Sequence, residues 1–158
     1  MYLTKEELKS AIYNYQIEQI TEADDDIILM AIGAAEDEAK GYLRPNDKKE
    51  FKDGRKIYDV ATIFTTTGTD RNVLLMEMIK SIAVWYIIRL CNVDMLYDHV
   101  KERYDRAIAW LKDVQKGVIT LDLPTINLAD TNGDGQVDEN DDTLYPFRFG
   151  SRNKFNHE

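Results

Sequence analysis

The stretch LMEMIKSIAVWYIIRL, residues 75–90, decides the fold class of this sequence. Apolar residues recur in it every three or four positions, which is the spacing of one face of an α-helix. The main stripe consists of Leu75, Ile79, Ile82, Ala83, Tyr86, Ile87 and Leu90, and a second apolar face consists of Met78, Val84, Trp85 and Ile88. A helix that is apolar almost all round lies in the middle of a bundle or is covered by another subunit. The stretch therefore predicts an all-α protein built around this helix, which begins after Asp70.

Two helices are predicted before this central one. The first covers residues 4–13 and opens with a capping box, in which Thr4 and Glu7 satisfy each other's backbone N–H groups. The second covers residues 21–43 and ends before Pro45, which disfavours helix at the residue preceding it. Its inward face consists of Ile28, Ala31, Ile32, Ala35, Ala39 and Tyr42. The alanines on that face predict close approach by a neighbouring helix.

Residues 45–70 are the least regular part, and Tyr58, Val60 and Ile63 within them suggest a short strand or extended piece. A fourth helix is predicted over 93–116, followed by Gly117 in the left-handed C-cap conformation. Its inward residues are Leu96, Val100, Ala107, Ile108, Leu111 and Val114. The pattern then changes to VITLDL at 118–123, which Pro124 stops. We therefore expect a four-helix domain over 1–117 and an extended C-terminal arm over 118–158.

The charge of the chain is concentrated in that arm. The net charge is -9, and six acids between residues 130 and 142 account for most of it, since -9 + 6 = -3. No basic face favours nucleic-acid binding. The most apolar run, 82–88, is far shorter than the roughly 20 residues that span a bilayer. No secretory signal opens the chain, and a single cysteine, Cys91, fits a reducing compartment.

Residues 130–141, DTNGDGQVDEND, match the template of an EF-hand-type calcium loop. That template places oxygen ligands at positions 1, 3, 5, 7, 9 and 12 and a glycine at position 6. Gly135 stands at position 6, and Val137 is the apolar anchor at position 8. The predicted Ca²⁺ ligands are Asp130, Asn132, Asp134, the backbone carbonyl of Gln136, Asp138 and Asp141.

An aspartate, Asp141, stands where an EF-hand usually has glutamate, and in this the loop resembles that of dockerin modules. Dockerins use two such loops and this chain has one, with no incoming helix before it. The alternative interpretation is an Asx-rich turn that binds no metal. A lone loop of this kind is expected to bind calcium with a Kd of roughly 10⁻⁵ to 10⁻³ M. We expect the ion to staple the arm and not to act as a switch, which needs a bistable helix pair.

No motif for catalysis is found, so the chain is not expected to be an enzyme. The two histidines, His99 and His157, are predicted to lie on a helix surface and in the tail. The aromatic residues Trp85, Tyr86 and Trp110 fall on core stripes. Three charged residues of the second helix are predicted to form an ordinary solvated face: Glu36, Glu38 and Lys40.

Several segments together resemble the short phage Mu-like proteins of tailed bacteriophages and prophages. They are MYLTKEEL, AIGAAEDEAKGYL, IKSIAVWYII, ERYDRAIAWLKDVQKGVITLDLP and FGSRNKFNH, at residues 1–8, 31–43, 79–88, 102–124 and 149–157. The most specific part runs from Arg103-Tyr104 to Gly117, with Tyr104, Trp110 and Leu111 where that family has them. The family is grouped with head–tail connector, or adaptor and head-completion, proteins.

The resemblance implies a helical subunit that assembles as a ring of about a dozen copies beneath the portal. Its expected partners are therefore copies of itself, the portal protein and neck or tail proteins, with no sequence-specific nucleic acid and no membrane. Its expected location is the virion neck, and the bacterial host cytoplasm during assembly. Two other hypotheses remain open: a calcium-dependent protein-interaction module organised by the 130–141 loop, and a small cytosolic enzyme or regulator.

Overall fold

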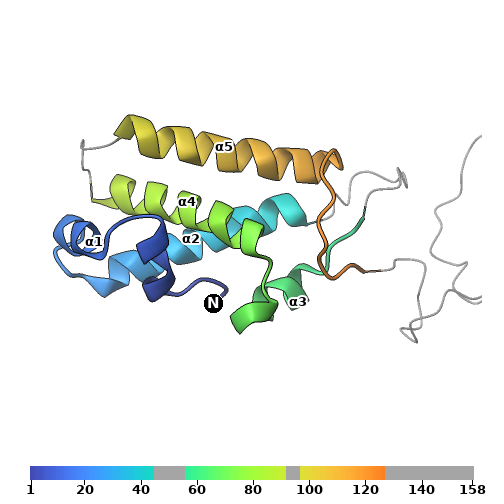
Figure 1. Cartoon of the computed structure of the whole chain (residues 1–158), viewed down its shortest axis with the longest axis horizontal. Coiled ribbons are helices and arrows are strands. Elements are labelled where there is room, and N and C mark those ends of the chain that lie inside the picture. Colours follow the sequence, from blue (N-terminus) through green and yellow to red (C-terminus); the bar gives the residue numbers. More distant parts are fainter. Residues whose placement is uncertain (45–55, 92–96, 127–158) are drawn as a thin grey trace, which may run out of the picture.

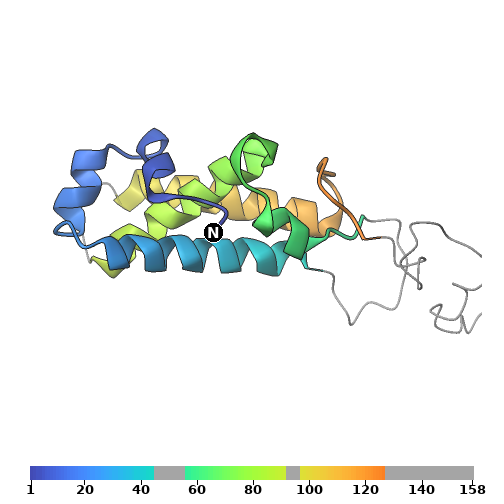
Figure 2. The same ribbon diagram turned by 90° about the horizontal axis from the view of Figure 1, so that it is seen from below.

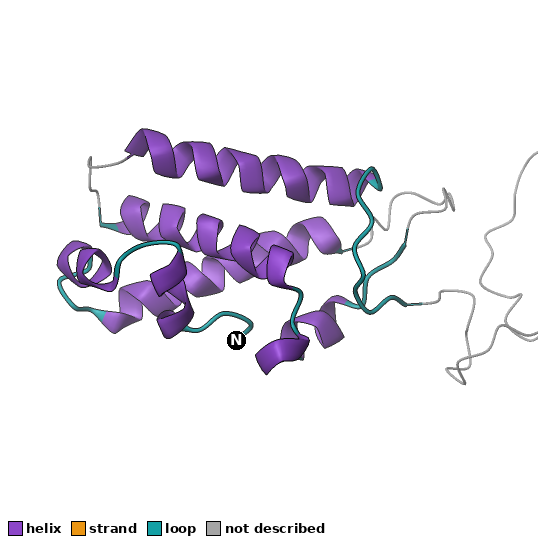
Figure 3. Cartoon of the chain, in the orientation of Figure 1, coloured by secondary structure: helices purple, strands orange, loops and turns teal. Residues whose placement is uncertain are grey.

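The structure is a computed structural model that describes residues 1–44, 56–91 and 97–126, and these parts are helices joined by loops (Figure 3). The α-helices are α1 (Asn14–Ile20), α2 (Asp25–Leu43), α3 (Val60–Thr65), α4 (Val73–Leu90) and α5 (Tyr97–Lys116). Two 3-10 helices accompany them, η1 (Lys5–Ser10) and η2 (Gly68–Asp70). No strand occurs in the described ranges, so the prediction of an all-α protein is confirmed. The start of the predicted helix at 93 and the calcium loop at 130–141 lie outside the described residues.

The three long helices, α2, α4 and α5, form the body of the protein, and each contacts the other two. Figure 1 shows α1 at one end of this body and α3 toward the other. Figure 2, turned by 90°, shows α2 extending along the body with η1 and α1 on one side of it. The body therefore has two different ends. One is formed by α1 and the start of α2, and the other by α3 and residues 118–126.

Helix α4, which is apolar on two faces, is covered within the chain. Its main stripe is buried at Leu75, Ile79, Ile82, Ala83 and Ile87, and its second face is buried at Val84, Trp85 and Ile88. The bundle interior therefore explains why α4 is apolar on two faces, and this feature alone requires no second subunit.

The alanine face of α2 is buried as predicted. Ala31, Ala35 and Ala39 have no exposed surface, which lets the neighbouring backbone approach closely. The helix ends at Leu43 as expected, but it begins at Asp25 and not at Thr21. The Asp24 carboxylate caps it by accepting from the Asp26 N–H at 2.9 Å. Thr21 instead ends α1, where its hydroxyl donates to the carbonyl of Ile17 at 2.9 Å, and two residues with positive φ, Glu22 and Ala23, separate it from α2.

The prediction of one helix over 4–13 is wrong. The chain forms η1, turns, and then forms α1, although the Thr4 N–H does donate to Glu7 Oε2 at 2.9 Å as the capping box requires. Leu8 and Ile17 are both buried. In one continuous helix these two side chains, nine residues apart, would point to opposite sides, because each residue advances about 100°. The turn at 11–13 lets both reach the same core.

The predicted extended piece at Tyr58, Val60 and Ile63 is also wrong in most of its length, because Val60 and Ile63 belong to α3. The Asp59 carboxylate caps this helix by accepting from the Thr62 N–H at 3.0 Å. Only Tyr58 is extended, in an isolated antiparallel bridge with Thr125. The Asp59 cap therefore outweighed the preference of the β-branched residues Val60 and Ile63 for a strand.

The first part of the predicted arm lies against this bridge. Gly117 ends α5 with a φ of 78°, the left-handed conformation that was expected. Beyond it, Leu121 is buried and its N–H donates to the hydroxyl of Tyr58 at 2.9 Å. Backbone bonds from Asp59 and Ile126 hold the next residues, at 2.9 and 2.8 Å. Residues 118–126 are thus fixed to the helical body.

Candidate functional site

The residues predicted to bind calcium, Asp130, Asn132, Asp134, Gln136, Asp138 and Asp141, all lie outside the described residues. Within the described ranges, no three His, Cys, Asp or Glu side chains are grouped so that they could hold a metal ion. The calcium site therefore stays a prediction from the sequence. What the structure does bring together are two polar clusters and two sets of exposed apolar side chains.

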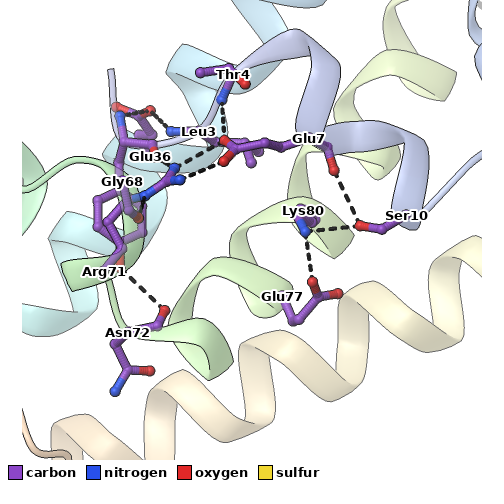
Figure 4. Close-up of polar contacts among 11 residues, drawn as sticks. Leu3, Thr4, Glu7, Ser10, Glu36, Gly68, Arg71, Asn72, Glu77 and Lys80 are labelled. Atoms are coloured by element: carbon purple, nitrogen blue, oxygen red, sulfur yellow. Dashed lines mark hydrogen bonds and ion pairs between the residues drawn. The ribbon is translucent and has the colours of Figure 1, made fainter.

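The first cluster, which we call the N-terminal clasp, consists of Glu7, Glu36 and Arg71 with the backbone of Tyr2 and Leu3 (Figure 4). Glu36 lies on the buried face of α2 and is 5% exposed. Its Oε1 atom accepts the N–H of Tyr2 at 2.6 Å and the N–H of Leu3 at 3.0 Å. Burial of a carboxylate is costly unless donors satisfy it, and these two backbone groups do so.

Arg71 holds the same N-terminal segment from its carbonyl side. Its Nη1 atom donates to the carbonyl of Tyr2 at 2.6 Å and to Glu7 Oε2 at 2.9 Å, and its Nη2 atom pairs with Glu7 Oε1. Its Nε atom donates to the carbonyl of Gly68, at 2.9 Å. The guanidinium beside Glu7 lowers the pKa of that carboxyl to about 2. Arg71 thus ties η1, the N-terminal segment and the start of α4 together.

The ring of Tyr2 completes the clasp. It lies 5.1 Å from the ring of Phe64 between centroids, and its hydroxyl donates to the carbonyl of Asn72 at 3.3 Å. Burial raises the pKa of Tyr2, with its hydrogen bond to Asn72 and the charge of Arg71 acting in the opposite direction. The clasp therefore holds both the main chain and the side chain of the N-terminal segment.

A buried lysine lies next to the clasp. Lys80 of α4 is 4% exposed, and its Nζ atom donates to Ser10 Oγ at 2.8 Å and to Glu77 Oε1 at 2.6 Å (Figure 4). The serine and glutamate oxygens accept two of the three hydrogen bonds that the ammonium group can donate. The contact joins the end of η1 to α4, so its role is to fix helix positions.

The second cluster, the tyrosine–carboxylate cluster, consists of Glu38 of α2, Tyr86 of α4 and Tyr104 of α5. The Tyr86 hydroxyl donates to Glu38 Oε2 at 3.1 Å, and the Tyr104 hydroxyl donates to Glu38 Oε1 at 2.9 Å. All three side chains are half-buried. Burial and the Glu38 carboxylate raise the pKa of both tyrosines. One carboxylate therefore links the three long helices.

These clusters correct the prediction that Glu36, Glu38 and Lys40 form a solvated face. Glu36 is buried, Glu38 is half-buried with both oxygens occupied, and Lys40 pairs with Asp37 at 2.9 Å. The position of Glu36 was readable, because it falls between Ala35 and Ala39 on the inward stripe. No local pattern marks Glu38, whose partners are 48 and 66 residues away.

The larger apolar side chains that stay exposed fall into two sets. Those toward the α1 end are Tyr13, Tyr15, Leu29, Met30 and Leu90. Those toward the α3 end are Val73, Leu74, Val118 and Ile126. Met1, at the N-terminus, is exposed as well. Since monomeric proteins expose single apolar residues routinely, it is the separation into two sets at different ends that is of interest.

The other residues that were singled out in the sequence form no further polar cluster among the described residues. His99 is exposed on α5, as predicted, whereas His157 lies outside the described residues. Cys91 is a free thiol at the end of α4, and burial raises its pKa. Trp85 is buried, and Tyr86 and Trp110 pack at the edge of the core. None of the helices in the described ranges is long and apolar enough to cross a membrane.

Comparison with known proteins gives one match. A family model described as Bacteriophage Mu, Gp36 matches residues 70–139, which include α4, α5 and the start of the arm. No curated protein and no solved structure matches the chain. The match covers 70 of the 158 residues, so the chain is similar to this phage Mu family over α4, α5 and the start of the arm. It does not extend to the N-terminal segments or to the tail at 149–157.

Proposed function

We propose that this protein is a structural subunit of a phage or prophage neck. In this role it is a head–tail connector, or adaptor, that assembles as a ring between the portal and the tail. The observation that carries the proposal is the match of α4, α5 and the start of the arm to the phage Mu Gp36 family. The ring of about a dozen copies, and the portal, neck and tail proteins as partners, are what the resemblance of these segments to connector proteins implies.

The shape of the body supports a ring. In a closed ring of identical copies, each subunit uses two different surfaces, one for each neighbour. The exposed apolar residues fall into two sets toward opposite ends, with Leu29 and Met30 in one and Val73 and Leu74 in the other. The core of α4 is already covered within the chain, so α4 does not need a second copy to bury it. Assembly then needs only these smaller surfaces and the arm.

In the same proposal, the calcium loop fixes the conformation of the arm. A Ca²⁺ ion held by Asp130, Asn132, Asp134, the backbone carbonyl of Gln136, Asp138 and Asp141 would fix residues 130–141, which follow in sequence the bridge of Thr125 with Tyr58. The protein holds no catalytic role in this proposal. It acts in the virion neck, after assembly in the host cytoplasm.

A surface variant tests the proposal. Leu29→Glu combined with Met30→Glu places two charges in the set at the α1 end, where the two side chains are 43% and 64% exposed. The free energy of unfolding should change by about 0.5 kcal/mol or less, because neither side chain is buried. The double variant should no longer co-sediment with the portal protein and should no longer form ring oligomers. Ala109→Glu, on the exposed face of α5, is the matched control and should assemble normally.

The sequence of the loop also favours the second candidate, a calcium-dependent interaction module unrelated to virions. The two functions differ in how they respond to a chelator. The connector should keep its portal binding in part when calcium is removed, because the helical surfaces remain. The module should lose all partner binding with chelator and stay a single copy in every condition.

A further inference from the structure

The tyrosine–carboxylate cluster holds a charge that its own partners do not neutralise. Glu38 accepts from two neutral hydroxyl groups, and the ion pairs within the described part of the chain do not include it. The nearest base in sequence, Lys40, pairs with Asp37. A half-buried carboxylate with neutral partners only still attracts a cation, since each oxygen has more acceptor capacity than one hydroxyl uses.

The surroundings of Glu38 favour a cation that also stacks on rings. The ring of Tyr104 lies on the ring of Trp85, with centroids 5.1 Å apart and an angle of 22° between the planes. Tyr42 is close enough for the Glu38 charge to raise its pKa, second to the effect of burial. Aromatic faces attract cations, and the planar guanidinium of arginine both stacks on rings and pairs with carboxylates. Arg89 already lies over the ring of Trp85, with its guanidinium carbon 6.0 Å from the ring centroid, and among the described residues it forms no ion pair with Glu38. This contact shows that a guanidinium group fits the aromatic surface, and a second arginine could pair with the Glu38 carboxylate.

The chain itself carries a segment with the complementary chemistry. Residues 145–155, YPFRFGSRNKF, contain three bases, four aromatic residues and no acid. Arg148 stands between Phe147 and Phe149. The other base-rich segment, 45–55, mixes four bases with three acids and has a single aromatic residue, Phe51. Charge and aromatic content therefore both favour the C-terminal segment as the occupant.

The length of the chain permits this contact. Residue 126 is the last that the structure describes, and 148 - 126 = 22 residues separate it from Arg148. An extended chain of that length spans up to about 73 Å. A 20-residue helix such as α5 is about 30 Å long. The segment can therefore reach any part of the body.

We propose that the tyrosine–carboxylate cluster is the docking site of residues 145–155, with the guanidinium of Arg148 placed on the Glu38 carboxylate. Phe147 and Phe149 then lie beside the aromatic residues around it. Docking fixes the far end of the arm on the seam between α2 and α5. This goes beyond the ring proposal and does not depend on it, because it is measured on the chain in solution without a portal.

Limited digestion of the full chain by trypsin tests the docking, with each cleavage rate followed by mass spectrometry. A docked segment is cut only when it opens, so its cleavage rate reports the open fraction. Glu38→Gln, which keeps hydrogen-bonding capacity toward both tyrosines, should speed cleavage after Arg148, Arg152 and Lys154 by about tenfold. Glu102→Gln, an exposed acid of α5 that pairs with Arg106, is the matched control and should change nothing.

A second variant keeps the test independent of folding. Arg148→Gln should speed cleavage after Arg152 and Lys154 by the same factor, and adding Glu38→Gln to it should give no further increase. Helical circular dichroism should be unchanged in all variants. Equal cleavage rates in Glu38→Gln and the unaltered chain would overturn the proposal. So would faster cleavage confined to Lys52 and Arg55, which would identify segment 45–55 as the occupant.

Discussion

Arg71 and Glu7, separated by 64 residues in the chain, form a bidentate ion pair that fixes η1 to the start of α4. The pair has one consequence that depends on pH. The folded pKa of Glu7 is about 2, below its ordinary value of 4.5. A lowered carboxyl pKa contributes stability that is fully present above the unfolded pKa and is lost as pH falls through the folded one.

We therefore predict that the ion pair stabilises the protein by about 2 kcal/mol at neutral pH, a figure reduced for the partial exposure of Glu7. This contribution should disappear between about pH 4.5 and pH 2. Glu7→Gln, which keeps the hydrogen bond to the Thr4 N–H, should be less stable than the unaltered chain at pH 7 and equally stable near pH 2. Urea unfolding across this range measures the difference, with Glu6→Gln at the exposed neighbour as control. A constant difference at all pH values would contradict the assignment.

Glu36→Ala should be strongly destabilising. The substitution leaves the buried N–H groups of Tyr2 and Leu3 without their acceptor, and each such loss costs about 1–3 kcal/mol. We expect a total of about 2–4 kcal/mol in the free energy of unfolding. Both N–H groups bond to the same oxygen, so Glu36→Gln, which keeps one carbonyl oxygen, should lose less than half as much. Equal losses in the two variants would show that the charge of Glu36 matters more than its acceptor.

Glu22→Gly should stabilise the protein. Glu22 and Ala23 have φ angles of 53° and 62° in the turn between α1 and α2, a conformation that costs non-glycine residues about 1 kcal/mol each. The Ala23 N–H donates to the carbonyl of Glu18 at 2.8 Å, which is the bond of a Schellman cap. We expect a gain of about 0.5–1 kcal/mol by thermal unfolding. Glu18→Gly, within α1, should instead destabilise by about 1 kcal/mol.

Asp130→Ala combined with Asp134→Ala should abolish calcium binding and leave the helical signal intact, because residues 130–141 belong to none of the described helices. Isothermal titration should give a Kd of roughly 10⁻⁵ to 10⁻³ M for the unaltered chain. Asp122→Ala, an exposed acid of the arm outside the loop, should bind calcium normally. Loss of helix in the double variant would show that body and arm are one folding unit.

The long periodic helices of this protein could be predicted from sequence, whereas its short ones could not. Helix α4 has eighteen residues and apolar spacing along its whole length, so its bounds were recovered within a few residues. Helices α1 and α3 have seven and six residues and bury Ile17 and Ile63 in the core, and only α3 has a side-chain cap, at Asp59. Segments this short carry too little periodicity to compete with β-branched composition or a neighbouring capping box.

The polar clusters also differ in how far they could be predicted from the sequence. Glu36 lies on a predicted inward stripe, and its burial followed from its position between two alanines. Its partners Tyr2 and Leu3, and the pairing of Arg71 with Glu7, depend on how distant segments meet. The tyrosine–carboxylate cluster draws one residue from each of three helices, so only the packing of the bundle brings Glu38, Tyr86 and Tyr104 together.

In the proposed function, copies of this chain form a ring with the portal protein. Native mass spectrometry of the purified chain, alone and mixed with the portal protein of its own phage, tests it most directly. We predict a complex that carries about a dozen copies of the chain on each portal ring. A single 18.3 kDa copy that binds no portal, with and without calcium, would contradict the connector assignment.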